Sequence, residues 1–156
     1  MSVDYVRRDR VLRGYIEGRD WDEGVEFALV REVVLRSAEF LPNYPLLIEY
    51  EWEVLPGSTT FGRGDLVFGD GDGHFAVVEV KTIEGSGKRT NRRTKVEEQA
   101  LRYAAAWERR HPGSVVQALV YTDDYLYPGL RSAGGPREND VGPFHPNHPP
   151  SSDCTS

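Results

Sequence analysis

The chain has 156 residues, of which 38% are hydrophobic and 11% aromatic. This length fits one domain with one core, and the apolar content excludes a chain that is disordered throughout. The formal net charge of −6 excludes a protein that coats nucleic acid through bulk positive charge. Any contact with nucleic acid therefore requires a local basic patch.

The first expected elements are two helices. Residues 3 to 17 predict a short, highly charged helix. Asp20 and Glu23 then have the spacing of a capping box, and apolar residues at helical spacing continue to about Glu39. Pro42 ends this second helix.

Three strands are expected next. Polar and apolar residues alternate from 46 to 54, which is typical of a half-buried strand. Residues 61 to 68 predict a second strand, and the glycine-rich segment 69 to 73 predicts a hairpin into a third. That third strand, 75 to 83, is apolar on both faces, which indicates a central position in the sheet.

The rest of the chain predicts one more helix and one more strand. Residues 84 to 93 are polar and basic and predict a mobile loop. Thr94 and Glu97 form a second capping-box candidate, opening a helix that ends near Arg110. Residues 115 to 121 predict the fourth strand.

The expected order is therefore helix, strand, strand, strand, helix, strand (αβββαβ). This order indicates the α/β class, with a mixed central sheet flanked by helices. We assign residues 20–127 to this domain, 1–19 to a charged N-terminal segment and 128–156 to a disordered tail rich in Pro, Gly and Ser.

Composition also bears on location. Cys154 is the one cysteine, so neither an internal disulfide nor a cysteine-based zinc cluster is expected, which favours an intracellular, cytoplasmic or nuclear location. The sequence has no apolar run of signal-peptide type and none long enough to cross a membrane, so no membrane partner is expected.

Charged residues occur where a buried sheet is expected. Glu79 and Lys81 are two apart on the predicted central strand, so both side chains project from one face. Charges there are costly unless they pair or bind something. Asp65 lies in the neighbouring strand of the hairpin, which brings it towards Glu79. Gly62 and Gly64 leave room beside Asp65 for a phosphate or a metal.

These residues form motifs. The segment Gly62 to Asp65, followed by Glu79-Val80-Lys81, resembles the GxxD and ExK motifs of the PD-(D/E)xK nuclease superfamily. Gly64 stands where the superfamily's name has Pro, a substitution common in its RecB-like branch. Gln99 and Tyr103 match the QxxxY motif of that branch, and their spacing places them on one helix face. The resemblance covers roughly residues 20 to 122 and implies a restriction-endonuclease-like core.

The resemblance also implies roles for the residues. Asp65 and Glu79, with the Val80 carbonyl, would bind Mg²⁺ or Mn²⁺, and Lys81 would assist the attacking water. Gln99 and Tyr103 would lie beside the site. The superfamily usually adds a Glu from the first core helix, for which we choose Glu26, with Glu32 as the rival. A Glu in the first turn of a helix also suits the helix dipole without any catalytic role.

A dense basic run follows the ExK strand. It is expected to grip the DNA backbone beside the metal. A solvated loop and a nuclear localisation signal are the alternatives. The residues are Lys88, Arg89, Arg92, Arg93 and Lys95.

The expected function is Mg²⁺-dependent hydrolysis of DNA, in repair, recombination or defence against foreign DNA. The alternative is a catalytically inactive relative that binds nucleic acid or protein, and a third possibility is an interaction protein whose site is accidental. The sequence does not separate DNA from RNA, or endonuclease from exonuclease, and leaves the oligomeric state open. Because no targeting domain is visible, a protein partner that supplies substrate targeting is a further expectation.

Overall fold

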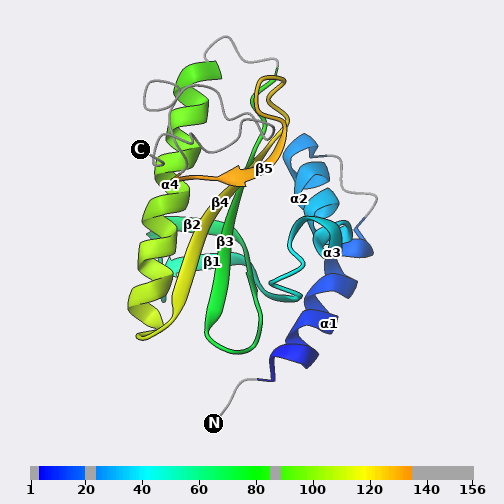
Figure 1. Ribbon diagram of the computed structural model, residues 1–156, viewed down its shortest axis with the longest axis vertical. Coiled ribbons are helices and arrows are strands. Elements are labelled where there is room, and N and C mark those ends of the chain that lie inside the picture. Colours follow the sequence, from blue (N-terminus) through cyan, green and yellow to red (C-terminus); the bar gives the residue numbers. More distant parts are fainter. Residues whose placement is uncertain (1–3, 20–23, 85–88, 135–156) are drawn as a thin grey trace, which may run out of the picture.

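The computed structural model describes residues 4–19, 24–84 and 89–134 (Figure 1). Three helices precede a hairpin-rich sheet, and a long helix crosses over to the last two strands. The elements are α1 (Tyr5–Glu17), α2 (Val25–Leu35), α3 (Ser37–Phe40), β1 (Leu46–Leu55), β2 (Ser58–Gly69), β3 (His74–Lys81), α4 (Arg89–Arg110), β4 (Val115–Thr122) and β5 (Gly129–Ser132).

The strands form one five-stranded mixed sheet in the order β1-β2-β3-β4-β5. β3 and β4 are parallel and joined by α4, whereas the other neighbours are antiparallel. α4 covers one face of the sheet, and α1, α2 and α3 lie against the other (Figure 1). The predicted α/β class and the central position of β3 are confirmed, and the arrangement is compatible with a restriction-endonuclease-like core.

The core has one half on each face of the sheet. Because side chains alternate along a strand, consecutive residues enter different halves. Val67 and Val77 pack with Trp107 on the α4 side, whereas Leu66 and Val78 pack with α2 on the other side. β2 and β3 are therefore apolar on both faces near the hairpin, and a charged side chain there requires partners.

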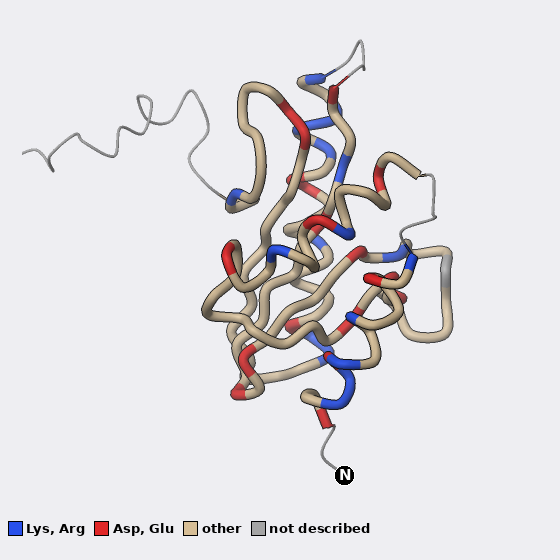
Figure 2. The backbone as a smooth tube through the Cα atoms, turned by 90° about the vertical axis from the view of Figure 1, so that its right-hand side faces the viewer, with Lys and Arg blue, Asp and Glu red and all other residues tan. Residues whose placement is uncertain are grey.

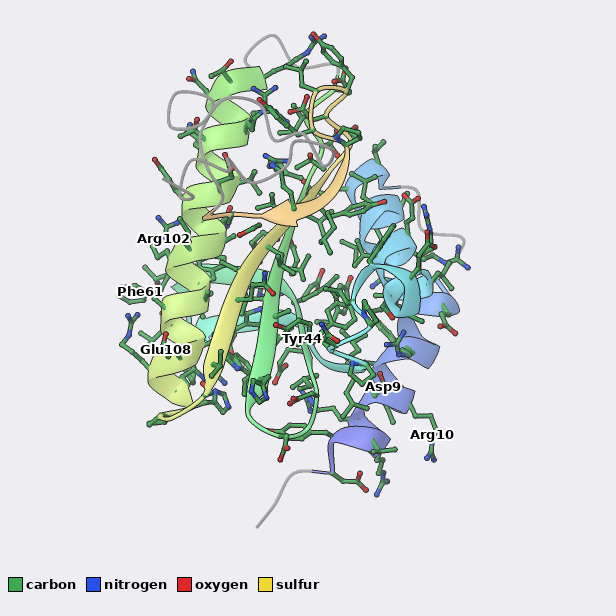
Figure 3. All side chains as sticks on the ribbon, in the orientation of Figure 1. Asp9, Arg10, Tyr44, Phe61, Arg102 and Glu108 are labelled. Atoms are coloured by element: carbon green, nitrogen blue, oxygen red, sulfur yellow. The ribbon has the colours of Figure 1, made fainter. Side chains whose placement is uncertain are left out.

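The predicted charged helix at the N-terminus is confirmed as α1. Asp9 accepts a hydrogen bond from the Leu47 backbone N–H at 2.7 Å, and Arg8 pairs with Glu49 at 2.8 Å. Arg10, by contrast, points away from the sheet (Figure 3). Charged side chains of α1 therefore anchor this helix to β1.

The second predicted helix is interrupted. The sequence predicts one helix to about Glu39, but Arg36 departs from helical geometry, with φ −104° and ψ 17°, and separates α2 from α3. The Arg36 guanidinium bonds to Glu32 and to Glu39, one on each side of the break. The capping residues Asp20 and Glu23 lie outside the described residues.

The capping box predicted at Thr94 is wrong. α4 already begins at Arg89, so Thr94 lies inside the helix, and residues 89 to 93 are not a loop. Arginine favours helix, and Arg93 pairs with Asp124 of the loop after β4. That tertiary contact stabilises a first turn that local sequence signals do not mark.

The sequence predicts a disordered tail from residue 128, but the ordered fold continues beyond that point. Residues 129–132 form β5, which pairs with β4 from Leu119 to Thr122, and Ala133 is buried. A four-residue strand has little pattern of its own and depends on the edge of β4 for its hydrogen bonds. The remaining tail, 135–156, lies outside the described residues. Within the described parts, no helix combines the length and the apolar character needed to cross a membrane.

Candidate active site

The β2–β3 ladder ends where two carboxylates meet. Its last Cα partners are Leu66 and Val78, so the next pair along would be Asp65 and Glu79. Here the side chains bridge the strands instead. Glu79 Oε2 accepts from the Asp65 N–H at 2.9 Å, and Asp65 Oδ2 accepts from the Val80 N–H at 2.8 Å. Each carboxylate thus satisfies a backbone donor of the opposite strand, and the structure brings Asp65 and Glu79 together.

Both carboxyl groups are desolvated. Glu79 is 2% exposed, and burial raises its pKa well above the usual range, with the Asp65 charge adding to the effect. Burial also raises the pKa of Asp65, to about 7. The Val80 N–H and Lys81 oppose this, whereas Glu26 adds to it. Ionisation of both carboxyl groups would place more negative charge here than the surroundings compensate, and a bound cation would relieve that excess.

Glu26 and Lys81 meet at the carboxyl end of β3. Lys81 Nζ lies 3.7 Å from Glu26 Oε1, and the same oxygen accepts from the Thr82 N–H at 3.4 Å. Glu26 stands in the first turn of α2, so that helix carries it to the strand end. The rival, Glu32, instead pairs with Arg36 at 3.1 Å. Of the two glutamates, Glu26 is the one in contact with Lys81.

Gln99 and Tyr103 connect α4 to β2. Gln99 Nε2 donates to the Tyr103 hydroxyl at 2.9 Å, and the Tyr103 ring packs edge-on against Trp52. A Cβ at Gly62 would overlap the Tyr103 hydroxyl, and one at Gly64 would overlap the Trp52 indole. The sequence predicted that the space beside these glycines would admit a phosphate or a metal. In the structure, aromatic side chains fill it.

Part of the basic run is used inside the protein. Arg92 donates to the Thr82 carbonyl at 3.0 Å, and Arg93 pairs with Asp124, which is fully buried. These two side chains tie the first turns of α4 to the strand ends, a structural role that sequence reasoning did not foresee. Contact between Arg92 or Arg93 and DNA remains a prediction.

The rest of the basic run is more open. Arg89 lies 3.8 Å from Glu84 in a loose ion pair, and Lys95 is exposed on α4. Lys88 lies outside the described residues. The described residues of the run belong to the first turns of α4, and Figure 2 shows basic and acidic positions close together at that end of the molecule.

Sequence reasoning missed Glu51. The β1–β2 register places it opposite Asp65, and its charge contributes to raising the pKa of Asp65. The flanking partners are Tyr50–Leu66 and Trp52–Gly64. Glu51 has φ 50°, the one non-glycine positive φ in the described chain, a conformation that favours glycine. Counting back from the turn between β1 and β2 would not have paired these residues, because the register shifts between Glu53 and Leu55.

The donor types suit a hard divalent cation. Carboxylate oxygens are the ligands that Mg²⁺ and Mn²⁺ prefer, and Asp65, Glu79 and Glu26 converge on the end of β3. Among the described residues, however, no three acidic, His or Cys side chains are assembled as a ready cation site. Glu26 is turned to Lys81, so binding a cation by all three carboxylates requires it to rotate. The role of the Val80 carbonyl remains a prediction.

Searches of family models, curated proteins and solved structures found no match to this chain. A proposal for the function of this chain therefore rests on the residues of the site.

Proposed function

We propose that this chain is a Mg²⁺-dependent nuclease of the PD-(D/E)xK type, in the RecB-like branch, which hydrolyses phosphodiester bonds of DNA. The observation that carries the proposal is the reciprocal pair of hydrogen bonds between Asp65 and the Glu79–Val80 segment, at the point where β2 and β3 stop pairing. Two desolvated carboxylates held in this way would provide oxygen ligands in fixed positions for a cation.

The roles follow from position. Asp65, Glu79 and Glu26, with the Val80 carbonyl, would hold Mg²⁺. The ion, when bound, would draw charge from the phosphate and lower the pKa of a bound water. Lys81 stands two residues after Glu79 and would orient that water once Glu26 turns away from it. Gln99 and Tyr103 would keep β2 in place, since the Tyr103 hydroxyl fills the space at Gly62.

The charge balance supports cation binding over a purely structural pair. The charges of Glu26 and Glu51 disfavour ionisation of Asp65, and Lys81 opposes them. The charges of Asp65 and Glu26 likewise disfavour ionisation of Glu79. Buried carboxylates without compensation cost stability. A fold that needed only a structural contact here would be more stable with apolar or amide side chains, so the presence of two carboxylates favours a bound cation.

One observation favours the alternative, an inactive fold that binds nucleic acid or protein. Glu26 and Lys81 pair with each other, which occupies the third carboxylate and the proposed water-orienting group. In a binding module this ion pair would be permanent. Such a protein would bind DNA equally well with or without divalent cation and would tolerate loss of Asp65.

Cleavage assays separate the two functions. Single-stranded, duplex and branched DNA would be incubated with Mg²⁺ or Mn²⁺ and with the parent, Asp65→Asn, Glu79→Gln, Lys81→Ala and Glu26→Gln. We expect cleavage by the parent and a loss of about 100-fold or more in each variant, as is typical when a charged group at a reaction centre is removed. Glu32→Gln, on the same helix, is the matched control and should cleave normally.

A folded parent that cleaves none of these substrates, and whose DNA binding survives Asp65→Asn, would establish the binding module. If Glu32→Gln abolished cleavage and Glu26→Gln did not, the nuclease would stand with the helix carboxylate reassigned.

A further inference from the structure

The loop between β4 and β5, residues 123–128, displays two consecutive large side chains to solvent. Tyr125 is 62% exposed and Leu126 is 51% exposed. We call these two residues the apolar tip. Large side chains are usually buried on folding because burial is favourable, and neighbouring exposed ones mark a contact surface more often than a scattered single residue does.

The loop is held in place from its first residue. Asp123 Oδ1 accepts from the backbone N–H groups of Ile83 and Glu84, at 2.6 and 3.1 Å. The Tyr125 N–H in turn donates to Glu84 Oε1 at 2.9 Å. The loop is thus bonded to the segment that follows β3, and the exposure of the apolar tip is not a result of missing anchors.

A buried ion pair fixes the base of the tip. Asp124 has no exposed surface and pairs with Arg93 of α4. Burial acts to raise the pKa of Asp124, but the hydrogen bonds from Arg93 and Leu126 and the nearby arginine charges together outweigh it, and the pKa lies below its usual range. Asp124 also accepts from the Leu126 N–H at 3.1 Å. A buried ion pair therefore holds the loop in place, although its outermost side chains, Tyr125 and Leu126, are exposed to solvent.

The apolar tip lies beside the candidate active site. Lys81 is the Cα partner of Thr122, the residue before Asp123, in the parallel β3–β4 pair. The Arg89 guanidinium lies over the Tyr125 ring, 5.1 Å from its centre, and Arg92 is bonded to Thr82. An exposed aromatic side chain with an arginine over its ring, at the carboxyl ends of parallel strands, has the composition of a surface for single-stranded nucleic acid.

We infer that the apolar tip stacks on unpaired bases of a DNA strand entering the site, with Arg89 contacting the backbone phosphate. The inference rests on the proposed function and names the form of the substrate: a single-stranded segment or a frayed end. Bases inside a duplex present their faces to one another and are not available to Tyr125. The Arg89 guanidinium beside Tyr125 favours a polyanion over an apolar protein surface.

Binding is measured by fluorescence anisotropy with a single-stranded oligodeoxynucleotide of about 16 nucleotides, in EDTA so that no cleavage occurs. We expect Tyr125→Ala to weaken binding about tenfold, the scale of one stacked base, and Tyr125→Phe to retain binding because the ring remains. Arg89→Gln should reduce the slope of log affinity against log salt by about one. Val115→Ala, at the exposed opposite end of β4, and Arg109→Gln, on the last turn of α4, are matched controls expected to bind like the parent.

An oligonucleotide with abasic positions tests the stacking itself. The parent should bind it about tenfold more weakly, and Tyr125→Ala should add no further loss, since both changes remove the same contact. Equal losses for Tyr125→Ala on intact and abasic strands would overturn the inference, as would a parent that binds no single strand, in which case the tip faces a protein partner.

Failure of this inference is distinguishable from failure of the nuclease. A parent that cleaves DNA, and whose Tyr125→Ala variant binds and cleaves unchanged, overturns the inference alone. A parent that binds bases through Tyr125 but never cleaves, with any metal, overturns the nuclease and keeps the inference.

Discussion

The hydroxyl of Tyr103 occupies the space that a side chain at Gly62 would need. Tyr103 lies on α4 and Gly62 lies three residues before Asp65 on β2, so this contact sets the distance between the helix and the strand that carries the carboxylate. Gly62 also has φ +99°, a conformation that L side chains rarely adopt. Glycine is thus required here for two independent reasons.

Gly62→Ala should destabilise the protein by about 1–3 kcal/mol beyond the cost of its backbone conformation, because the new methyl group overlaps Tyr103. Urea unfolding measures the change. Gly113→Ala is the control, since Gly113 has φ +85° with no atom near its Cβ position. Adding Tyr103→Phe should recover part of the loss, and equal stabilities of the Gly62→Ala and Gly113→Ala proteins would refute the contact.

Metal-free stability should depend on pH through Asp65. Its folded-state pKa of about 7 lies above the ordinary value of 3.8, so the folded protein binds this proton more tightly than the unfolded chain does. The contribution of Asp65 to stability therefore falls as the pH rises from about 4 to about 7. Asp65→Asn removes the contribution. In EDTA, its stability relative to the parent should increase across this window, measured by urea unfolding at several pH values.

Asp70→Asn should show the opposite trend and serves as the control. Burial acts to raise the pKa of Asp70, but hydrogen bonds from Asp72 and His74 outweigh it, and the pKa is lowered. Its contribution is present above the unfolded pKa and is lost as the pH falls. A stability difference between Asp65→Asn and the parent that is independent of pH would contradict the desolvation of Asp65.

Glu51→Gln should lower the pKa of Asp65 below about 7. Glu51 lies opposite Asp65 in the β1–β2 register, and its negative charge disfavours ionisation of that carboxyl. Carboxyl-carbon NMR titration of Asp65 measures the shift. Glu53→Gln, on the same strand but opposite Arg63, should have a smaller effect. An unchanged titration in Glu51→Gln would place that charge outside the site.

Asp124→Ala should destabilise the fold by about 1–3 kcal/mol, because it leaves the Arg93 guanidinium without its buried acceptor. Loss of the exposed ion pairs of Arg36, in Arg36→Gln, should cost far less. Thermal unfolding of the two variants provides the comparison. Because Asp124 also positions the β4–β5 loop, Asp124→Ala should weaken single-strand binding, and normal binding would separate the loop geometry from this ion pair.

Local pattern alone was sufficient for much of the fold. The alternation over β1, the glycine-rich connection before His74 and the apolar run of β3 predicted a hairpin with β3 at the centre, and the structure confirms these elements. Their physical basis is local, since side-chain period and turn chemistry depend on near neighbours in the chain. The same pattern made Asp65, Glu79 and Lys81 stand out as charges on buried strands.

Other features depend on contacts between distant residues. The start of α4 depends on Arg93 reaching Asp124, and β5 depends on the free edge of β4. The close contact that excludes a side chain at Gly62 is made by Tyr103, far along the chain. None of these partners is close in sequence, so no local signal marks them.

The sequence by itself determined the order of the central elements, β1 to β4 with α4 between β3 and β4, and the residues on which a site would be proposed. Only the tertiary structure decided that Asp65 and Glu79 bridge two strands, that Glu26 rather than Glu32 contacts Lys81, and that Glu51 faces Asp65. The reason is physical: patterning reports which face a side chain takes, whereas the distance between two carboxylates is set by where strands stop pairing and how helices pack against them.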